Sequence, residues 1–205
     1  MSLRIHLASR NAKKVAEMER ILAAHLPGAE VVGLDAVPAY DEPVEDAPDF
    51  VGNALLKARA GLAATGLPTV ADDSGLCVEA LNGMPGVLSA RWSGPPKDDA
   101  RNNTLLLHQL ADVPDDRRGG WFACAVVACL PDGAELVVEG RMAGRVLREA
   151  RGSGGFGYDV LFEADDHPGL TTAELTREDK DAISHRGRAL RELAPRLVEA
   201  LRTTA

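Results

Sequence analysis

Residues 3–34 read LRIHLASRNAKKVAEMERILAAHLPGAEVVGL, and this stretch decides the fold class. The apolar run over 3–8 predicts a buried strand, and a short polar loop follows it. The next segment repeats apolar side chains at helical spacing, at Val15, Met18, Leu22 and Leu26. Pro27-Gly28 predicts the end of that helix, and 30–34 predicts a second strand. Strand, helix and strand in this order indicate an α/β protein.

The rest of the chain continues the alternation. A proline- and acid-rich loop over 35–49 precedes a predicted helix over 50–64, whose apolar stripe is Val51, Leu55, Ala58 and Leu62. Strands are predicted over 69–71, 76–81 and 158–163, a hairpin over 121–130 and 135–140, and a helix over 99–111. A terminal helix is predicted after Ser184, with a buried row of Leu190, Leu193, Leu197 and Leu201. With no linker or repeat in view, we expect one domain over 1–205, built around a mixed sheet.

The composition is that of an ordinary globular chain. The 205 residues are 45% hydrophobic and 26% charged, with a net charge of −8, which argues against a general nucleic-acid binder. A small anionic substrate stays possible, because a local cluster of cations can oppose the global field. Cys124 and Cys129 lie in an apolar run and are expected to be buried free thiols, which indicates a reducing compartment. No signal peptide and no apolar stretch of about 20 residues is visible, so we expect a cytoplasmic protein without a membrane partner.

Two helix starts carry cations where a helix prefers acids. Ser9-Arg10-Asn11-Ala12-Lys13-Lys14 joins the first strand to the first helix, where N–H groups and the helix dipole favour an anion. This segment is either a phosphate site or a pair of solvated lysines. His185 and Arg186 follow Ser184, a good N-cap, in the terminal helix. Both can donate hydrogen bonds to a carbonyl oxygen, which a 6-oxo purine offers and a 6-amino purine does not, although a structural His and a solvated Arg are the ordinary alternatives.

Asp72-Asp73-Ser74-Gly75 lies between two predicted strands, where loops of α/β sheets bind ligands. Adjacent carboxylates repel one another unless a cation lies beside them. Oxygen ligands suit Mg²⁺, and one carboxylate can take a proton from water; a structural Asx-turn is the alternative. Glu45, in the acidic loop, is placed to supply a further oxygen.

Two further motifs are weaker. Asn53 and Lys57 are four residues apart, so they share a helix face, which we expect to lie away from the apolar stripe. They are either site residues or an exposed polar pair. Residues 152–157 read GSGGFG but do not open a helix, which excludes a dinucleotide-binding loop. A glycine-rich segment with Phe156 suits stacking on a planar base, and a flexible turn is the alternative.

These segments together resemble the inosine/xanthosine triphosphate pyrophosphatase family over nearly the whole chain. The diagnostic blocks, in order, are LASRNAKK at 7–14, ADDSGL at 71–76, PGVLSAR at 85–91, GFGYD at 155–159, AEL at 173–175 and ISHRGRAL at 183–190. The resemblance implies an elongated two-lobed α/β fold around a long mixed sheet, with the active site in the cleft between the lobes, and a homodimer. It implies Mg²⁺-dependent hydrolysis of ITP, dITP and XTP to the monophosphate and pyrophosphate.

The resemblance also implies roles for single residues. Substrate binding falls to Ser9, Arg10, Asn11, Ala12, Lys13, Lys14, Asn53, Lys57, Ser74, Phe156, Gly157, Tyr158, Asp159, Lys180, His185 and Arg186. Within this set, Ser9, Asn11, Lys14 and Lys57 would bind the triphosphate. Phe156 would stack on the purine, with Asp159 near the nucleoside and Lys180, His185 and Arg186 reading the base. Glu45 and Asp73 would hold the metal, Asp73 would also be the base that activates water, and Asp72 would support them.

The chain departs from the family pattern at a few positions, namely Arg10, Leu88, Trp92, Val160 and Asp181. None removes a proposed catalytic group, although Asp181 is next to Lys180 and bears on substrate preference. Two rival functions stay open. One is a pyrophosphatase for other modified or pyrimidine triphosphates, and the other is a catalytically silent purine nucleotide-binding module.

Overall fold

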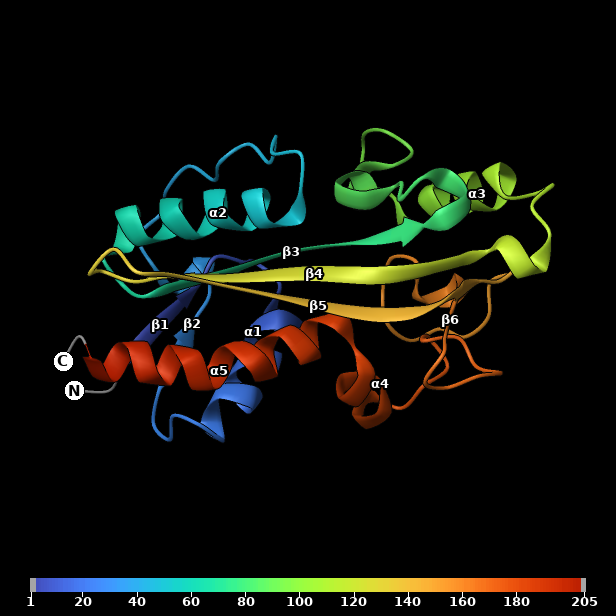
Figure 1. Cartoon of the computed structure of the whole chain (residues 1–205). Helices are drawn as coiled ribbons and strands as arrows, with labels where there is room; N and C mark the ends of the chain where they lie inside the picture. Colours follow the sequence, from blue (N-terminus) through green and yellow to red (C-terminus); the bar gives the residue numbers. More distant parts are fainter. Residues whose placement is uncertain (1–2, 204–205) are drawn as a thin grey trace. The chain divides into compact units, whose positions relative to one another are not determined.

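The computed structural model describes residues 3–203, apart from the side chains of Lys13 and Thr203. Six strands form one mixed sheet in the order β2-β1-β3-β4-β5-β6. They are β1 (Arg4–Leu7), β2 (Glu30–Val32), β3 (Thr69–Val78), β4 (Gly119–Cys129), β5 (Glu135–Val146) and β6 (Phe162–Ala164). β1 pairs in parallel with β2 and β3, and β5 pairs antiparallel with β6. The predicted α/β class with a mixed sheet is therefore confirmed (Figure 1).

Five α-helices accompany the sheet within the described range: α1 (Ala12–Ala23), α2 (Phe50–Thr65), α3 (Asp99–Gln109), α4 (Arg177–Ile183) and α5 (His185–Thr203). α2 begins after Asp49, whose side chain accepts a hydrogen bond from the Gly52 N–H, and ends at Gly66 in the left-handed region. Among the helices of the described part, none is long and apolar enough to cross a membrane.

The contacts divide the chain into two compact units. The first unit comprises 1–73, 124–140 and 186–205, and the second comprises 74–123 and 141–185. β3, β4, β5 and α5 each pass from one unit to the other. Two of the four divisions fall between Asp73 and Ser74 and between His185 and Arg186, inside motifs that the sequence singled out.

The first unit packs helices on both faces of its strands. α2 lies on one side, and α1 and α5 lie on the other (Figure 1). The strand residues alternate accordingly. Cys124, Val126, Ala128 and Leu130 join the core that contains α1 and α5 residues, whereas Ala125, Val127 and Cys129 join the core that contains Ala54 and Ala58 of α2. Side chains on a strand point alternately to its two faces, so β4 serves both layers.

The second unit has a core of its own. Leu106 and Leu110 from α3 and the chain just beyond it meet Leu161, Phe162 and Ile183. Phe122 packs edge to face on Phe162, with ring centroids 4.9 Å apart. This core supports the glycine-rich segment that precedes β6.

Several predicted boundaries need correction. β3 is one strand that runs through Asp72-Asp73-Ser74-Gly75, where two strands and a loop were predicted. The predicted strand over 158–163 is a 3-10 turn, Asp159–Leu161, followed by β6. α4 was not predicted. The buried residues of α2 are Asn53, Ala54, Ala58 and Gly61, so Asn53 does not lie on a face turned away from the core.

The prediction of buried free thiols at Cys124 and Cys129 is confirmed, and Cys77 is a buried free cysteine as well. Burial, with the nearby Glu135 carboxylate, raises the pKa of Cys129 to about 11. A thiol with such a pKa is protonated near neutral pH, so Cys129 is a core residue and not a nucleophile.

Candidate active site

Asp72 and Asp73 are neighbours on β3 but point to opposite faces of it. Val70 belongs to the core of α1 and α5, and Ala71 belongs to the core of α2. The alternation places Asp72 with α1 and α5 and Asp73 with α2. The two carboxylates therefore do not share a cation in the way that the sequence suggested.

Asp72 lies in a buried network of charges. Its carboxylate accepts hydrogen bonds from Lys14 Nζ at 2.9 and 2.8 Å and from Arg186 Nε at 3.0 Å. Arg186 Nη1 is also 3.8 Å from Glu17 Oε2. Burial opposes ionisation of Asp72, but Lys14 and Arg186 outweigh it and hold the pKa of this carboxyl well below its usual range. Asp72 is thus a fixed anion that orders two cations, and its supporting role beside the metal stays a prediction.

Asp73 lies in a second group with Glu45, Asn53 and Lys57. Asn53 is fully buried; its Nδ2 donates to Asp73 Oδ2 at 2.9 Å, and its Oδ1 accepts the Ala47 N–H at 3.0 Å. One amide therefore orients the Asp73 carboxylate and ties it to the backbone two residues after Glu45. Asn53 is a positioning residue in this geometry, because both ends of its side chain are bonded within the protein.

Lys57 joins the two carboxylates that were expected to hold a metal. Its Nζ is 2.9 Å from Glu45 Oε1 and 4.0 Å from Asp73 Oδ1. A cation held between two carboxylates is the arrangement that a divalent ion needs, since Mg²⁺ takes one or two protein carboxylates and completes its shell with water and phosphate oxygens. Among the described residues no group of three or more acidic, His or Cys side chains forms a closed metal cage. The donor set therefore fits an open Mg²⁺ site rather than a structural one.

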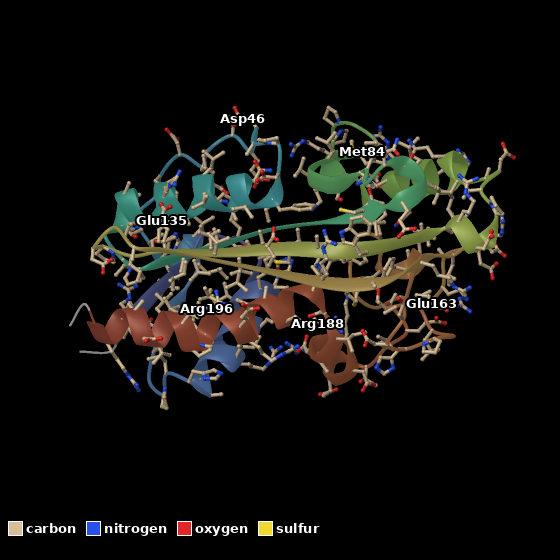
Figure 2. The ribbon with its side chains drawn as sticks, in the orientation of Figure 1. Asp46, Met84, Glu135, Glu163, Arg188 and Arg196 are labelled. Carbon is tan, nitrogen blue, oxygen red and sulfur yellow. The ribbon has the colours of Figure 1, made fainter. Side chains whose placement is uncertain are left out.

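The loop that carries Glu45 is anchored at several points. Asp46, the next residue, is marked on this segment before α2 (Figure 2). Tyr40 Oη lies 2.9 Å from His6 Nε2, and His6 Nδ1 lies 3.1 Å from the Val32 carbonyl oxygen. Burial lowers the pKa of His6, with the Val32 carbonyl opposing the change. These contacts tie the loop to β1 and β2 beside the start of α1.

The segment before α1 has the predicted form. α1 begins at Ala12, five residues after β1 ends, and has no acidic residue in its first turn. Ser9 Oγ accepts the Asn11 N–H at 3.2 Å, which shapes the turn. Arg10 is exposed and pairs with Glu42 at 2.8 Å and with Asp35 at 3.6 Å. The side chain of Lys13 lies outside the described residues, so its predicted contact with substrate is not assessed.

The second unit holds most of the residues expected at the base, Arg186 excepted. Phe156 is 51% exposed, and Lys180 Nζ lies 5.5 Å from its ring centroid. Asp159 is buried; its Oδ2 accepts hydrogen bonds from the Phe156 N–H and from Lys180, and its Oδ1 accepts one from Thr172. Asp159 thus orients Phe156 and Lys180, and its place near the nucleoside stays a prediction.

The other residues expected to bind substrate lie in different surroundings. His185 stacks on Phe122, with centroids 5.0 Å apart and planes 12° apart. Tyr158 is 4% exposed and donates its hydroxyl to the Ser89 carbonyl at 2.9 Å, so it is a core residue. Arg186 belongs to the Asp72 network of the first unit, and Ser74 is a half-buried residue of β3.

Sequence reasoning missed several residues that organise these groups. Glu17 completes the buried network, Tyr40 anchors the Glu45 loop, and Asp99 and Asn103 bind the Gly157 backbone. An acid in a first helical turn, as at Asp99, is so common that nothing marked it as part of a site.

Residues 5–196 match the sequence model of the Ham1 family. The chain belongs to the Ham1 family. A family relative, the dITP/XTP pyrophosphatase of Nocardia farcinica, is 60% identical over 195 residues, covering 95% of this chain and 94% of that protein. The Ham1 fold is also seen in solved structures. The nucleoside-triphosphatase / dITP/XTP pyrophosphatase of Mycobacterium abscessus is 55% identical with a TM-score of 0.78, covering 94% of this chain and 100% of that one. The HAM1 protein of Coxiella burnetii is 40% identical with a TM-score of 0.86, covering 96% and 99%.

Proposed function

We propose that the protein is a cytoplasmic, Mg²⁺-dependent pyrophosphatase that converts ITP, dITP and XTP to the monophosphate and pyrophosphate. The observation that carries the proposal is Lys57 held between Glu45 and Asp73, which is an open cation site built from two carboxylates. The relatives named dITP/XTP pyrophosphatase supply the substrate class. The family resemblance further suggests a homodimer.

In this proposal the first unit binds the triphosphate and the second binds the base. Lys14, Lys57 and the start of α1 would take the phosphate oxygens, because an ammonium and helix N–H groups both favour anions. Glu45 and Asp73 would hold Mg²⁺, which supplies positive charge to the phosphates and the departing pyrophosphate. Phe156 would stack on the purine, with Lys180 and His185 beside it.

The chemical step is a displacement at the α-phosphorus. Asp73 accepts a proton from a water molecule as the water oxygen bonds to that phosphorus. The bond from the α-phosphorus to the bridging oxygen breaks, and pyrophosphate leaves with the bonding electrons. Asn53 donates to Asp73 Oδ2 and so holds the carboxylate in one orientation. Lys57 and Lys14 neutralise charge that grows on the leaving group.

The deciding experiment is pyrophosphate release from ITP, XTP, dITP, ATP, GTP and dTTP, each with Mg²⁺ and with EDTA. We expect Mg²⁺-dependent release from the first three and slow release from the others. Equal rates on all six would still identify a pyrophosphatase but would contradict the proposed selection of the base. Binding without release from any of them would instead indicate a catalytically silent nucleotide-binding module.

A further inference from the structure

The backbone around Phe156 is held at every peptide group. The Phe156 N–H donates to Asp159 Oδ2 at 2.8 Å, and the Phe156 carbonyl accepts the Asp159 N–H at 3.3 Å. The Gly157 N–H donates to Asp99 Oδ2 at 2.8 Å, and the Gly157 carbonyl accepts Asn103 Nδ2 at 2.9 Å. The ring of Phe156 is nevertheless half exposed. A fixed backbone therefore presents an uncovered aromatic ring.

Two of these four hydrogen bonds come from one face of α3. Asp99 and Asn103 are four residues apart, so they lie one above the other on the helix and bind the N–H and the carbonyl of Gly157, which belong to two successive peptide groups. The helix is itself secured, because Asp98 caps it by accepting the Arg101 N–H at 3.0 Å and Leu106 is buried in the core of the second unit. The clamp is thus built on a rigid element.

Gly157 needs this support because of its conformation. Its φ is +62°, which only glycine adopts readily, and glycine has the largest conformational freedom to lose. Without the two bonds from α3 the segment would sample other conformations, and Phe156 would move with it. A stacking ring contributes most to affinity when it is already in place before the ligand arrives.

Asn103 carries a sign of this role. Its Nδ2 donates a hydrogen bond to the Gly157 carbonyl, whereas its buried Oδ1 has no hydrogen-bond partner among the described residues. A buried acceptor without a partner costs stability, so what the amide contributes at this position is its donor.

We propose that Asp99 and Asn103 are positioning residues that hold Phe156 ready to stack on the substrate's base. The inference rests on the proposed function, in which Phe156 receives a purine. It adds a clamp on α3 that acts through Gly157 and touches neither substrate nor metal. Base affinity should depend on this clamp, and polyphosphate affinity should not.

The two reaction products separate these affinities. IMP carries the base, and pyrophosphate carries none. We would measure the binding of IMP and the binding of pyrophosphate by calorimetry, in wild type and in Asp99→Ala and Asn103→Ala. We expect IMP binding to weaken by roughly 3- to 10-fold and the dissociation constant of pyrophosphate to stay unchanged. If the protein hydrolyses ITP, the KM for ITP should rise by a similar factor, with a smaller change in kcat.

Two further variants serve as controls. Asp99→Asn keeps an acceptor oxygen for the Gly157 N–H and should restore IMP binding. Thr104→Ala removes a hydroxyl that bonds only to Ala100 within α3 and should behave as wild type. A general loosening of α3 would weaken the binding of both IMP and pyrophosphate, and that result would overturn the inference. Unchanged IMP binding in both alanine variants would also overturn it.

The outcome is independent of the proposed activity. If Asp99→Ala binds IMP more weakly than wild type does, but wild type releases no pyrophosphate from ITP, the clamp stands and the proposed function falls. If wild type hydrolyses ITP and the alanine variants match it in IMP binding, the clamp falls and the function stands. Failure of wild type to bind IMP overturns the clamp, and pyrophosphate release then decides the function separately.

Discussion

Asp72 and Asp73 have the same chemistry and different surroundings. Asp72 faces two cations and is buried, whereas Asp73 faces an amide donor on one oxygen and a more distant ammonium on the other. The first arrangement fixes a charge between two cations, and the second orients the carboxylate that we propose as base and metal ligand. Substitution of each to Asn should therefore have different consequences.

Asp73→Asn should abolish most turnover and leave nucleotide binding largely intact. Loss of a general base costs about 10²- to 10⁴-fold in rate, and the amide that replaces it also binds metal poorly. Single-turnover hydrolysis of ITP, with the nucleotide dissociation constant measured in parallel, tests this. Near-normal activity would show that Asp73 is neither base nor metal ligand.

Asp72→Asn should act first on stability. Removing one partner of a buried ion pair costs about 3–5 kcal/mol, because Lys14 and Arg186 are left buried beside an uncharged amide. Urea unfolding of the variant measures the loss. Asp41→Asn, at an exposed position of the Glu45 loop, is the control and should change the unfolding free energy by less than about 0.5 kcal/mol. Equal stability of the two variants would contradict the buried network.

His6 should make the protein less stable as the pH falls. Its pKa is lowered in the folded protein by burial, so the unfolded chain binds the proton more readily. Stability from this group is complete above the unfolded pKa of about 6.5 and is lost as the pH drops below it. Unfolding free energies at pH 7.5 and pH 5.5 should differ less in His6→Gln than in wild type. An equal difference in both proteins would assign the pH dependence to other groups.

α2 approaches β1 and β3 closely at Gly61. A Cβ there would lie 2.7 Å from Thr69 Cγ2, 2.9 Å from His6 Cδ2 and 3.0 Å from Tyr40 Oη. The space that a side chain would fill is taken by the His6–Tyr40 anchor of the Glu45 loop. The absence of a side chain at Gly61 thus leaves room for the anchor of the loop as well as for the packing of the helix.

Gly61→Ala sets two effects against each other. Helix propensity favours Ala over Gly by about 1 kcal/mol, whereas overpacking a core costs about 1–3 kcal/mol. We expect net destabilisation, because three heavy atoms must move. Ala64→Gly, at an exposed position of the same helix, shows the propensity alone and should cost about 1 kcal/mol. Chemical unfolding compares them, and a more stable Gly61→Ala would refute the close packing.

The two features that sequence patterns missed, the continuity of β3 and the presence of α4, have different causes. Asp, Ser and Gly are poor strand formers, so Asp72-Asp73-Ser74-Gly75 predicts a loop. The structure continues β3 through them because each carboxylate finds partners from a different helix, and such long-range partners are invisible in a local pattern. α4 did carry a local signal, since Thr176 caps it by accepting the Asp179 N–H at 3.1 Å. By contrast, β1, α1, α5 and the hairpin follow from apolar periodicity, which is the signal that sequence carries best.

The candidate site was likewise predictable from the sequence only in part. Lys14, Lys57, Glu45, Asp73, Phe156 and Lys180 were indicated by residue type and family resemblance. Asn53 was indicated too, but as a substrate-binding residue. Asp99, Asn103 and Tyr40 were not indicated, and like Asn53 they act through backbone atoms or neighbouring side chains. Their roles depend on which strand and helix meet, and that information exists only once the chain is folded.

The two units share three strands and a helix, which bears on how the whole chain unfolds. Leu193 lies in the core of the first unit and Leu106 in the core of the second. Because β3, β4, β5 and α5 run through both, disruption of one unit should remove the ends of elements that the other needs.

We therefore expect one cooperative unfolding transition. Leu193→Ala and Leu106→Ala should each lower its midpoint, at a cost of about 2–5 kcal/mol for a buried leucine. Calorimetry, with circular dichroism as a second probe, makes the comparison. Two separate transitions, each sensitive to only one of the substitutions, would show that the units unfold independently.

The alternation along β3 also limits how this gene can change. The face on which a carboxylate lies depends on whether its position from Thr69 is odd or even. One codon inserted between Thr69 and Asp72 would turn both aspartates to the opposite face, with Asp72 in the place of Asp73 and Asp73 in the place of Ser74. Two codons would return both to their own faces but two residues away from their partners. We therefore expect insertions and deletions to be tolerated better in the flanking loops than in this part of the strand.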